Sequence, residues 1–358
     1  MPLTFDNSVT TGQWILEAEK LHKAVTPNTR AIILNSPHNP TGKVFTRREM
    51  ETIADILANV ASPSCVVISD EVYKYIIHSP PKEEESQSEL RQGRITHGNG
   101  HSHKEAIACP GHVHFASLPG MWDRTITISS AGKTFSATGW QVGWCIGPKT
   151  LISSIHQLIP YVQFCASTVI QEALARALPR ADLPYEGFTN YYEYLKDKYT
   201  RKRDALALAL KRAGFTVPDY EYVPGGGFFI FARIGEEISN ALPKERINVP
   251  NAAAPGGIAR KDWALCQWLA EERGVLCIPA SPFFSKERAV EGASDDFVRI
   301  AFCKTDETIE AAASAFMSLQ KVHQAHAPPL SNAAEVNNTD TDKEKSKAAA
   351  LELLDERV

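Results

Sequence analysis

The sequence predicts an α/β fold, in which a mostly parallel sheet flanked by helices is followed by a smaller α+β domain. Three short apolar runs, at 31–34, 66–69 and 125–128, are separated by helical or polar segments. This order is typical of parallel strands joined by crossover connections. After about residue 188 the pattern changes to long helices and isolated strands, which indicates a second domain.

The first two apolar runs frame a β-α-β unit. Ala31–Leu34 leads into a turn at Pro40–Gly42, a helix, and then Val66–Ser69. Thr46 and Glu49 have the spacing of a capping box, which fixes the start of the helix. Its apolar residues recur on one face, at Met50, Ile53, Ile56, Leu57 and Val60. Because both runs are continuously apolar, we expect strands covered on both faces.

The third run, Thr125–Ile128, leads into Ser129–Thr134, and Cys145-Ile146 is a candidate hairpin partner for it. Later elements are expected as strands at 228–234, 275–278 and 298–302 and as helices at 191–212, 259–273 and 306–322. Gly214 and Gly274 are expected to end the first two of these helices. Gly225–Gly227 is expected to bend the chain before the strand at 228.

These elements divide the chain into three parts. We expect a large domain over 1–187, a small C-terminal domain over 188–326 and a disordered tail over 327–358. Within the large domain, 79–112 is rich in Glu, Ser, Gly and His, and it is expected to be a disordered insertion. The histidines and the cysteine in this segment and just after it are loosely spaced, so no metal site is predicted from them: His97, His101, His103, Cys109, His112 and His114.

Composition favours small-molecule chemistry. The 358 residues are 43% hydrophobic and carry a formal net charge of −4, so they can form sizeable cores and offer no basic surface for nucleic acid or membranes. The seven cysteines contain no Cys-x-x-Cys pair, which is typical of a reducing compartment. Met1–Asn7 lacks the features of a signal peptide. We expect a cytoplasmic protein, with mitochondria as the alternative.

Polar residues follow the carboxyl ends of all three predicted parallel strands. Asn39 follows the first, Asp70 and Tyr73 the second, and Lys133 the third. That edge of an open α/β sheet is where ligands bind. Lys133 lies in a Gly-Lys-Thr loop and is a candidate Schiff-base nucleophile. A P-loop is excluded because Thr127 occupies the position of its first glycine.

Several motifs in this order resemble the class I/II aminotransferases of fold type I, which use pyridoxal 5'-phosphate (PLP). The resembling segments are 39–42 (NPTG), 69–73 (SDEVY), 129–136 (SSAGKTFS), 139–144 (GWQVGW), 224–229 (PGGGFF) and 298–302 (VRIAF). The likeness is strongest to the branch of kynurenine-oxoglutarate aminotransferase, glutamine transaminase K and cysteine-conjugate β-lyase. Residues 117–122 (SLPGMW) and 136–140 (SATGW) carry that finer match.

The resemblance implies roles for individual residues. Lys133 would bind PLP and then move the substrate α-proton, and Asp70 would pair with the pyridinium nitrogen. Tyr73 and Asn39 would bond the 3'-oxygen of the ring. Arg299 would bind the substrate α-carboxylate and Ser130 the cofactor phosphate. Phe164 would lie near the active site of a partner subunit, since the family commonly forms homodimers.

Two departures from the family pattern affect the phosphate site. Gln141 stands where the family usually has Arg or Lys, and an amide supplies no ionic attraction. We also expect the chain to lack the N-terminal stretch that holds a phosphate-binding turn and an aromatic residue stacked on the ring. Both departures leave open a non-catalytic remnant.

The expected reaction transfers an amino group from a kynurenine-like, aromatic or glutamine-like amino acid to a 2-oxo acid. β-Elimination from cysteine conjugates is an alternative that needs the same residues. Four of the site residues also have a structural interpretation: a solvated loop lysine at Lys133, a helix cap at Asp70, a turn former at Asn39, and an ion pair at Arg299.

Overall fold

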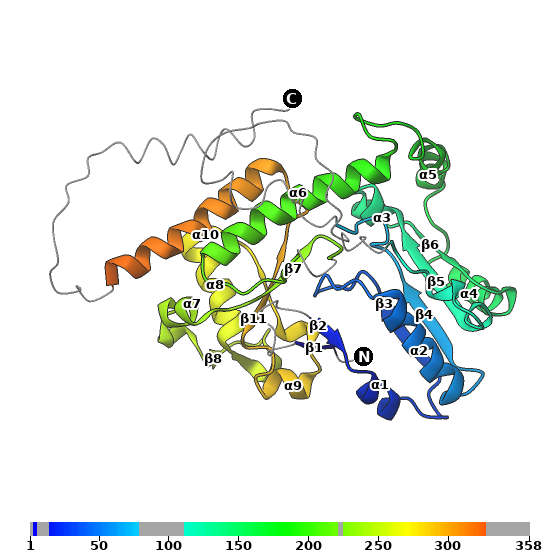
Figure 1. The fold of residues 1–358 in the computed structure, drawn as a ribbon, viewed down its shortest axis with the longest axis horizontal. Coiled ribbons are helices and arrows are strands. Elements are labelled where there is room, and N and C mark those ends of the chain that lie inside the picture. The colour runs from blue at the N-terminus through cyan, green and yellow to red at the C-terminus, as the bar shows by residue number, and fades with distance from the viewer. Residues whose placement is uncertain (1–2, 6–13, 79–110, 221–224, 327–358) are drawn as a thin grey trace, which may run out of the picture. The chain divides into compact units, whose positions relative to one another are not determined.

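The computed structural model describes residues 3–5, 14–78, 111–220 and 225–326 (Figure 1). Met1–His323 forms one compact unit, and the second unit begins at Gln324, inside the last helix. The predicted insertion at 79–112 lies outside the described residues except for its last two positions, and the predicted tail at 327–358 lies outside them entirely.

The first sheet has four strands in the order β3-β4-β5-β6: β3 (Ala31–Asn35), β4 (Val66–Asp70), β5 (Thr125–Ser130) and β6 (Gly143–Ile146). The first three are parallel, and β6 pairs with β5 in the antiparallel sense. The parallel strands and the hairpin partner at 145–146 are therefore where the sequence predicts them.

Helices α1 (Ala18–Ala24) and α2 (Arg47–Asn59) pack beside this sheet, and their apolar residues share a core with β3 and β4. Thr46 and Glu49 form the predicted capping box. The Glu49 amide donates to Thr46 Oγ1 at 3.2 Å, and the Thr46 amide donates to Glu49 Oε2 at 2.8 Å. Two of the four amides left free at a helix start thus gain a partner.

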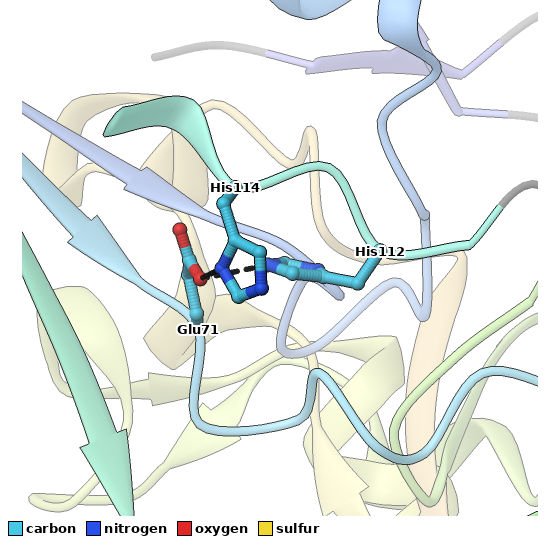
Figure 2. Close-up of side chains that lie close together, drawn as sticks. All are labelled: Glu71, His112 and His114. Atoms are coloured by element: carbon cyan, nitrogen blue, oxygen red, sulfur yellow. Dashed lines mark hydrogen bonds and ion pairs between the residues drawn. The ribbon is translucent and has the colours of Figure 1, made fainter. Parts of the chain in front are cut away.

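The expectation of strands covered on both faces is wrong for β3. Buried and more accessible residues alternate along β4 and β5, and Ile33 on β3 is 64% exposed. Directly after β4, Glu71 is buried and lies beside His112 and His114 of the segment that leads to β5 (Figure 2).

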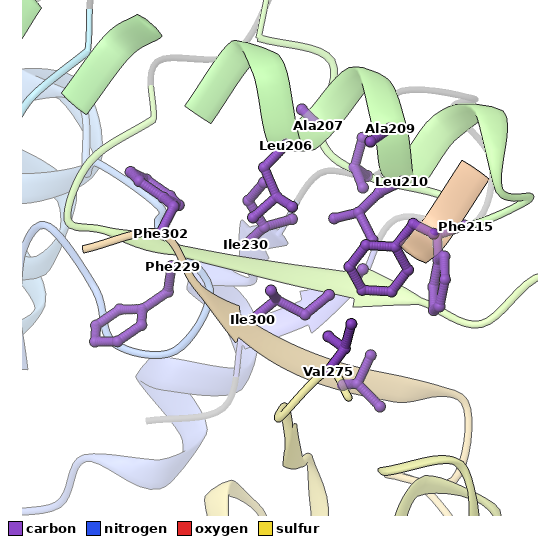
Figure 3. Packing of buried hydrophobic residues seen from close by; sticks show 14 of the residues in the cluster. Leu206, Ala207, Ala209, Leu210, Phe215, Phe229, Ile230, Val275, Ile300 and Phe302 are labelled. Atoms are coloured by element: carbon purple, nitrogen blue, oxygen red, sulfur yellow. The ribbon is translucent and has the colours of Figure 1, made fainter. Parts of the chain in front are cut away.

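The second sheet is antiparallel, in the order β10-β11-β7, with β10 (Ile278–Pro279), β11 (Phe297–Ala301) and β7 (Phe229–Arg233). Its core is formed with α6 (Tyr191–Arg212), α8 (Lys261–Arg273) and α10 (Asp306–His326). In Figure 3, Leu206 and Leu210 of α6 face Ile230 and Ile300 of the strands.

Glycines end α6 and α8 as predicted. Gly214 has φ 94° and Gly274 has φ 67°, the left-handed backbone that glycine adopts most easily. The predicted strand at 275–278 is wrong in all but its last residue. The Val275 amide donates to Leu269 O and so closes the end of α8, and only Ile278 and Pro279 pair with β11.

The remaining elements are short or peripheral. They are β1 (Leu3–Phe5), β2 (Trp14–Leu16), α3 (Ala131–Thr134), α4 (Lys149–Val162), α5 (Thr168–Arg180), α7 (Glu236–Ala241), β8 (Val249–Pro250), β9 (Ile258–Ala259) and α9 (Lys286–Val290). Among the described residues no helix is both long and apolar enough to cross a membrane.

Candidate active site

The carboxyl ends of β3 and β4 are joined by one amide side chain. Asn35 is the last residue of β3 and lies opposite Asp70 in the parallel register. Its Nδ2 donates to Asp70 O at 3.0 Å, and its Oδ1 accepts from the Asn39 amide at 2.7 Å. Asn35 therefore holds Asn39 close to Asp70. Sequence reasoning missed this residue, although its place at the end of an apolar run was a usable signal.

Lys133 lies on α3, a single helical turn directly after β5, and not in the loop that we expected. Ser130 caps this turn, since its Oγ accepts from the Gly132 amide at 3.1 Å. Gly132 packs tightly on the following turn: a Cβ there would lie 2.9 Å from Thr138 Cα. Lys133 is half-buried and makes no hydrogen bond or ion pair with the described residues. Its amine is therefore available to a ligand.

Asp70 is the last residue of β4, and its carboxylate interacts electrostatically with the Lys133 ammonium group. Burial raises the pKa of the Asp70 carboxyl, while the Val72 amide and the Lys133 ammonium oppose that rise. Asp70 Oδ1 accepts from the Val72 amide at 3.3 Å. A partly buried carboxylate close to an ammonium group suits a ligand that carries a cationic ring and an electrophilic carbon.

Tyr73 connects Asp70 with Arg299. Burial, and to a smaller extent the Asp70 carboxylate, raise the pKa of Tyr73 to about 12 against the opposing effect of the Arg299 guanidinium. The ring packs edge-on against Phe228 and Phe229, at centroid distances of 5.3 and 5.8 Å. The phenol is therefore held in place and stays protonated at neutral pH, so that it can donate a hydrogen bond.

Arg299 comes from β11 of the second sheet and reaches the turn after β3. Its Nη1 donates to Asn39 Oδ1 at 3.0 Å. The guanidinium lies between two rings, 4.5 Å from the centroid of Phe229 and 4.7 Å from that of Phe283. Sequence reasoning missed both rings, because nothing local links them to Arg299.

The guanidinium of Arg299 is incompletely satisfied. Within the described part of the chain its Nε is buried without a hydrogen-bond partner, and no carboxylate lies within 4.0 Å of it. Burial lowers the pKa of Arg299. The half-buried guanidinium therefore lacks full solvation, and no carboxylate of the described residues compensates its charge. A carboxylate ligand would supply one.

The two residues expected at the phosphate, Ser130 and Gln141, each bond to nearby backbone groups. Ser130 Oγ serves the α3 cap described above. Gln141 is exposed, has left-handed backbone with φ 54°, and donates from Nε2 to Thr138 O at 2.8 Å. Phe164, expected near a partner's site, is 79% exposed at the end of α4.

The fold and these residues define a class of protein. The family model described as "aminotransferase class I and II" matches residues 7–316, and the chain belongs to this family. The predicted family resemblance and fold class are thereby confirmed.

Within the family, the chain is 36% identical over 316 residues to the kynurenine–oxoglutarate transaminase of Dictyostelium discoideum, covering 88% of this chain and 62% of that protein. It is 33% identical to human kynurenine–oxoglutarate transaminase 3, covering 84% and 55% respectively. The N-succinyldiaminopimelate aminotransferase of Mycobacterium tuberculosis has a similar structure, with a TM-score of 0.63, 31% identity and 89% and 64% of the two chains covered. The chain thus spans less than two thirds of each relative.

Proposed function

We propose that the chain acts as a PLP-dependent aminotransferase that moves an amino group between a kynurenine-like, aromatic or glutamine-like amino acid and a 2-oxo acid. The observation that carries this proposal is a series of hydrogen bonds: Arg299 Nη1 donates to Asn39 Oδ1, the Asn39 amide donates to Asn35 Oδ1, and Asn35 Nδ2 donates to Asp70 O. Lys133 also lowers the pKa of Asp70, and Asp70 and Arg299 shift the pKa of Tyr73 in opposite directions. The likeness to kynurenine–oxoglutarate transaminases supports the donor and acceptor classes.

The residues fit the ring end of PLP. When bound, the cofactor would supply an electron sink for the substrate α-carbon. Lys133, whose amine has no hydrogen-bond or ion-pair partner among the described residues, would bind the cofactor aldehyde and then take the proton from the α-carbon and return it. Asp70 would hold a proton on the pyridine nitrogen, and Tyr73 and Asn39 would donate hydrogen bonds to the 3'-oxygen.

Arg299 would bind the α-carboxylate of both substrates. Its planar guanidinium offers several N–H donors in fixed directions. One of them is used by Asn39, and the buried Nε lacks a partner among the described residues. A carboxylate placed there would gain charge-assisted hydrogen bonds and neutralise the cation. At the other end of the site, Ser130 and Gln141 would contact the phosphate.

The test is the visible absorption band of lysine-bound PLP, followed by kinetics. We expect purified protein mixed with PLP to show the band, Lys133→Ala to lack it, and Lys23→Ala, in the exposed part of α1, to keep it. Protein with the band should transfer nitrogen from kynurenine to 2-oxoglutarate. An absent band, or a band kept by Lys133→Ala, would overturn the proposal. Ammonia release without an oxo acid would instead indicate β-elimination.

The same proposal includes a domain division and a homodimer. We assign 1–187 to a PLP-binding large domain and 188–326 to a small domain. In the described part of the chain, one core gathers buried residues between Leu21 and Met121. Another gathers buried residues between Leu195 and Leu319, together with Tyr73 and Ile76 from the first part. An exposed apolar group around the end of α4, Tyr161, Val162 and Phe164, supports a subunit contact. Light scattering tests the dimer, and fractionation tests a cytoplasmic or mitochondrial location.

A further inference from the structure

Two imidazoles and one carboxylate meet just beyond the end of β4, outside the group of residues assigned to PLP. His112 Nε2 lies 2.8 Å from Glu71 Oε2, and His114 Nδ1 lies 2.5 Å from the same oxygen (Figure 2). All three candidate ligand atoms lie within 4.8 Å of one another. In a four-coordinate zinc site with bonds of about 2.0–2.1 Å, neighbouring ligand atoms are roughly 3.3 Å apart. Small side-chain shifts would therefore admit an ion.

The chain holds these three side chains in place. The Glu71 side chain is 1% exposed, and Ser69 Oγ donates to its other oxygen, Oε1, at 2.9 Å. Val113, between the two histidines, is buried in the core of the first sheet. The Ser69 bond orients the carboxylate and leaves Oε2 to the imidazoles, which is the supporting arrangement that metal ligands commonly have.

His112 provides a second, independent observation. Its side chain is only 7% exposed. Neither ring nitrogen makes a hydrogen bond of acceptable geometry within the described part of the chain, although Nε2 is so close to Glu71 Oε2. A buried polar group without a well-formed bond is costly. A metal ion bound to both His112 Nε2 and Glu71 Oε2 would give each of these atoms a partner.

We propose that Glu71, His112 and His114 form a binding site for a divalent transition-metal ion, with Zn²⁺ as the best match. Imidazole and carboxylate together suit zinc, whereas calcium and magnesium prefer oxygen ligands alone. Three protein ligands leave the fourth position to water. His114 is 49% exposed, so the site has a path to solvent. The alternative is a structural pair of carboxylate–imidazole contacts, which no metal would change.

The test is titration of the full-length protein with Zn²⁺ by calorimetry and with Co²⁺ by visible absorption. The three histidines and the cysteine at 97–109 could also bind metal nonspecifically. Both titrations therefore use a background variant in which these four residues are replaced: His97→Ala, His101→Ala, His103→Ala and Cys109→Ala. We expect one ion per chain in this background. We also expect the cobalt spectrum of a four-coordinate site with nitrogen and oxygen ligands.

Two ligand variants and one control decide the outcome. His114→Ala and Glu71→Gln should each weaken binding by at least about 100-fold, since loss of an outer partner alone costs about 10–100-fold. His156→Ala, at an exposed position of α4, should bind as the background does. His114 is half-exposed, so its variant should fold even where Glu71→Gln does not, as circular dichroism will show. No binding in the background, or equal binding by His114→Ala, would overturn the proposal.

Discussion

Arg299 donates a hydrogen bond of 3.0 Å to Asn39 Oδ1, although the two residues are 260 positions apart in the sequence. Asn35 in turn fixes Asn39 by accepting from its amide. The turn after β3 of the first sheet and the middle strand of the antiparallel second sheet are thus connected through the side-chain amide of Asn39 and the guanidinium of Arg299. This contact places the proposed carboxylate-binding group beside the proposed ring-binding groups.

The geometry at Arg299 predicts that lysine cannot replace it. Arg299→Lys loses the directed bond to Asn39 and the planar group between Phe229 and Phe283. Hydrogen bonds to charged groups contribute about 1.5–3 kcal/mol, so kcat/KM for the amino acid should fall by ~10–100-fold. The absorption band of lysine-bound PLP should persist. Arg246→Lys, at the exposed pair with Glu271, is the control, and a change of less than twofold at Arg299 would contradict the assignment.

A substitution at Gln141 should strengthen ligand binding, whereas Arg299→Lys should weaken it. Its amide bonds only Thr138 O among the described residues and is exposed. If it faces the phosphate, Gln141→Arg should tighten PLP binding, because an ionic hydrogen bond adds about 1–2 kcal/mol. The dissociation constant for PLP should fall by ~5–30-fold at low salt, and less at high salt. Gln141→Met is the neutral control. An unchanged, salt-independent constant would place the phosphate elsewhere.

Local signals predicted the parts of this fold that local chemistry determines. Thr46 and Glu49 specify a helix start within four residues, and Gly214 and Gly274 specify helix ends, because capping needs only nearby groups. The positions of Asn39, Asp70 and Lys133 could be predicted for a related reason: parallel strands bring their carboxyl ends to one edge.

Contacts between distant segments could not be read from the sequence. An apolar run such as 31–34 does not reveal whether one or both faces of the strand are covered, and Ile33 is in fact exposed. The rings of Phe229 and Phe283 around Arg299, and the approach of His112 to Glu71, depend on the packing of separate elements. The loose spacing of the histidines hid the last of these, since it does not reveal that His112 and His114 lie next to a buried carboxylate.

The buried His78 predicts a loss of stability in acid. Burial holds the pKa of His78 well below its usual value, and the Arg203 guanidinium lowers it further. The unfolded chain therefore binds a proton at about pH 6.5 and below, where the folded chain does not. The free energy of unfolding should fall with decreasing pH from that point by up to ~1.4 kcal/mol per pH unit, and the loss should end only once pH falls below the folded pKa.

Urea unfolding of the wild type and of His78→Phe, measured at a series of pH values, checks this. Phenylalanine keeps a planar ring beside Phe302, which His78 contacts at a centroid distance of 5.7 Å. The variant should lose part of the acid slope. The same substitution at the exposed His22 is the matched control. Identical slopes for wild type and His78→Phe would show that His78 is not the group responsible.

Gly226 sets how closely the antiparallel sheet approaches the turn that carries Asn39. A Cβ at this position would lie 2.6 Å from Pro37 Cβ and Cγ and 3.0 Å from Ile76 O. Proline carbons cannot rotate away, so Gly226→Ala should destabilise the protein by about 1–3 kcal/mol, the usual cost of overpacking. Gly139→Ala, where nothing lies within 4 Å, should change the free energy of unfolding by less than about 0.5 kcal/mol. Because Pro37 and Asn39 share one turn, Gly226→Ala should also displace Asn39 from Arg299 and raise KM for the amino acid. A variant with wild-type stability and KM would mean that this close approach does not position the site.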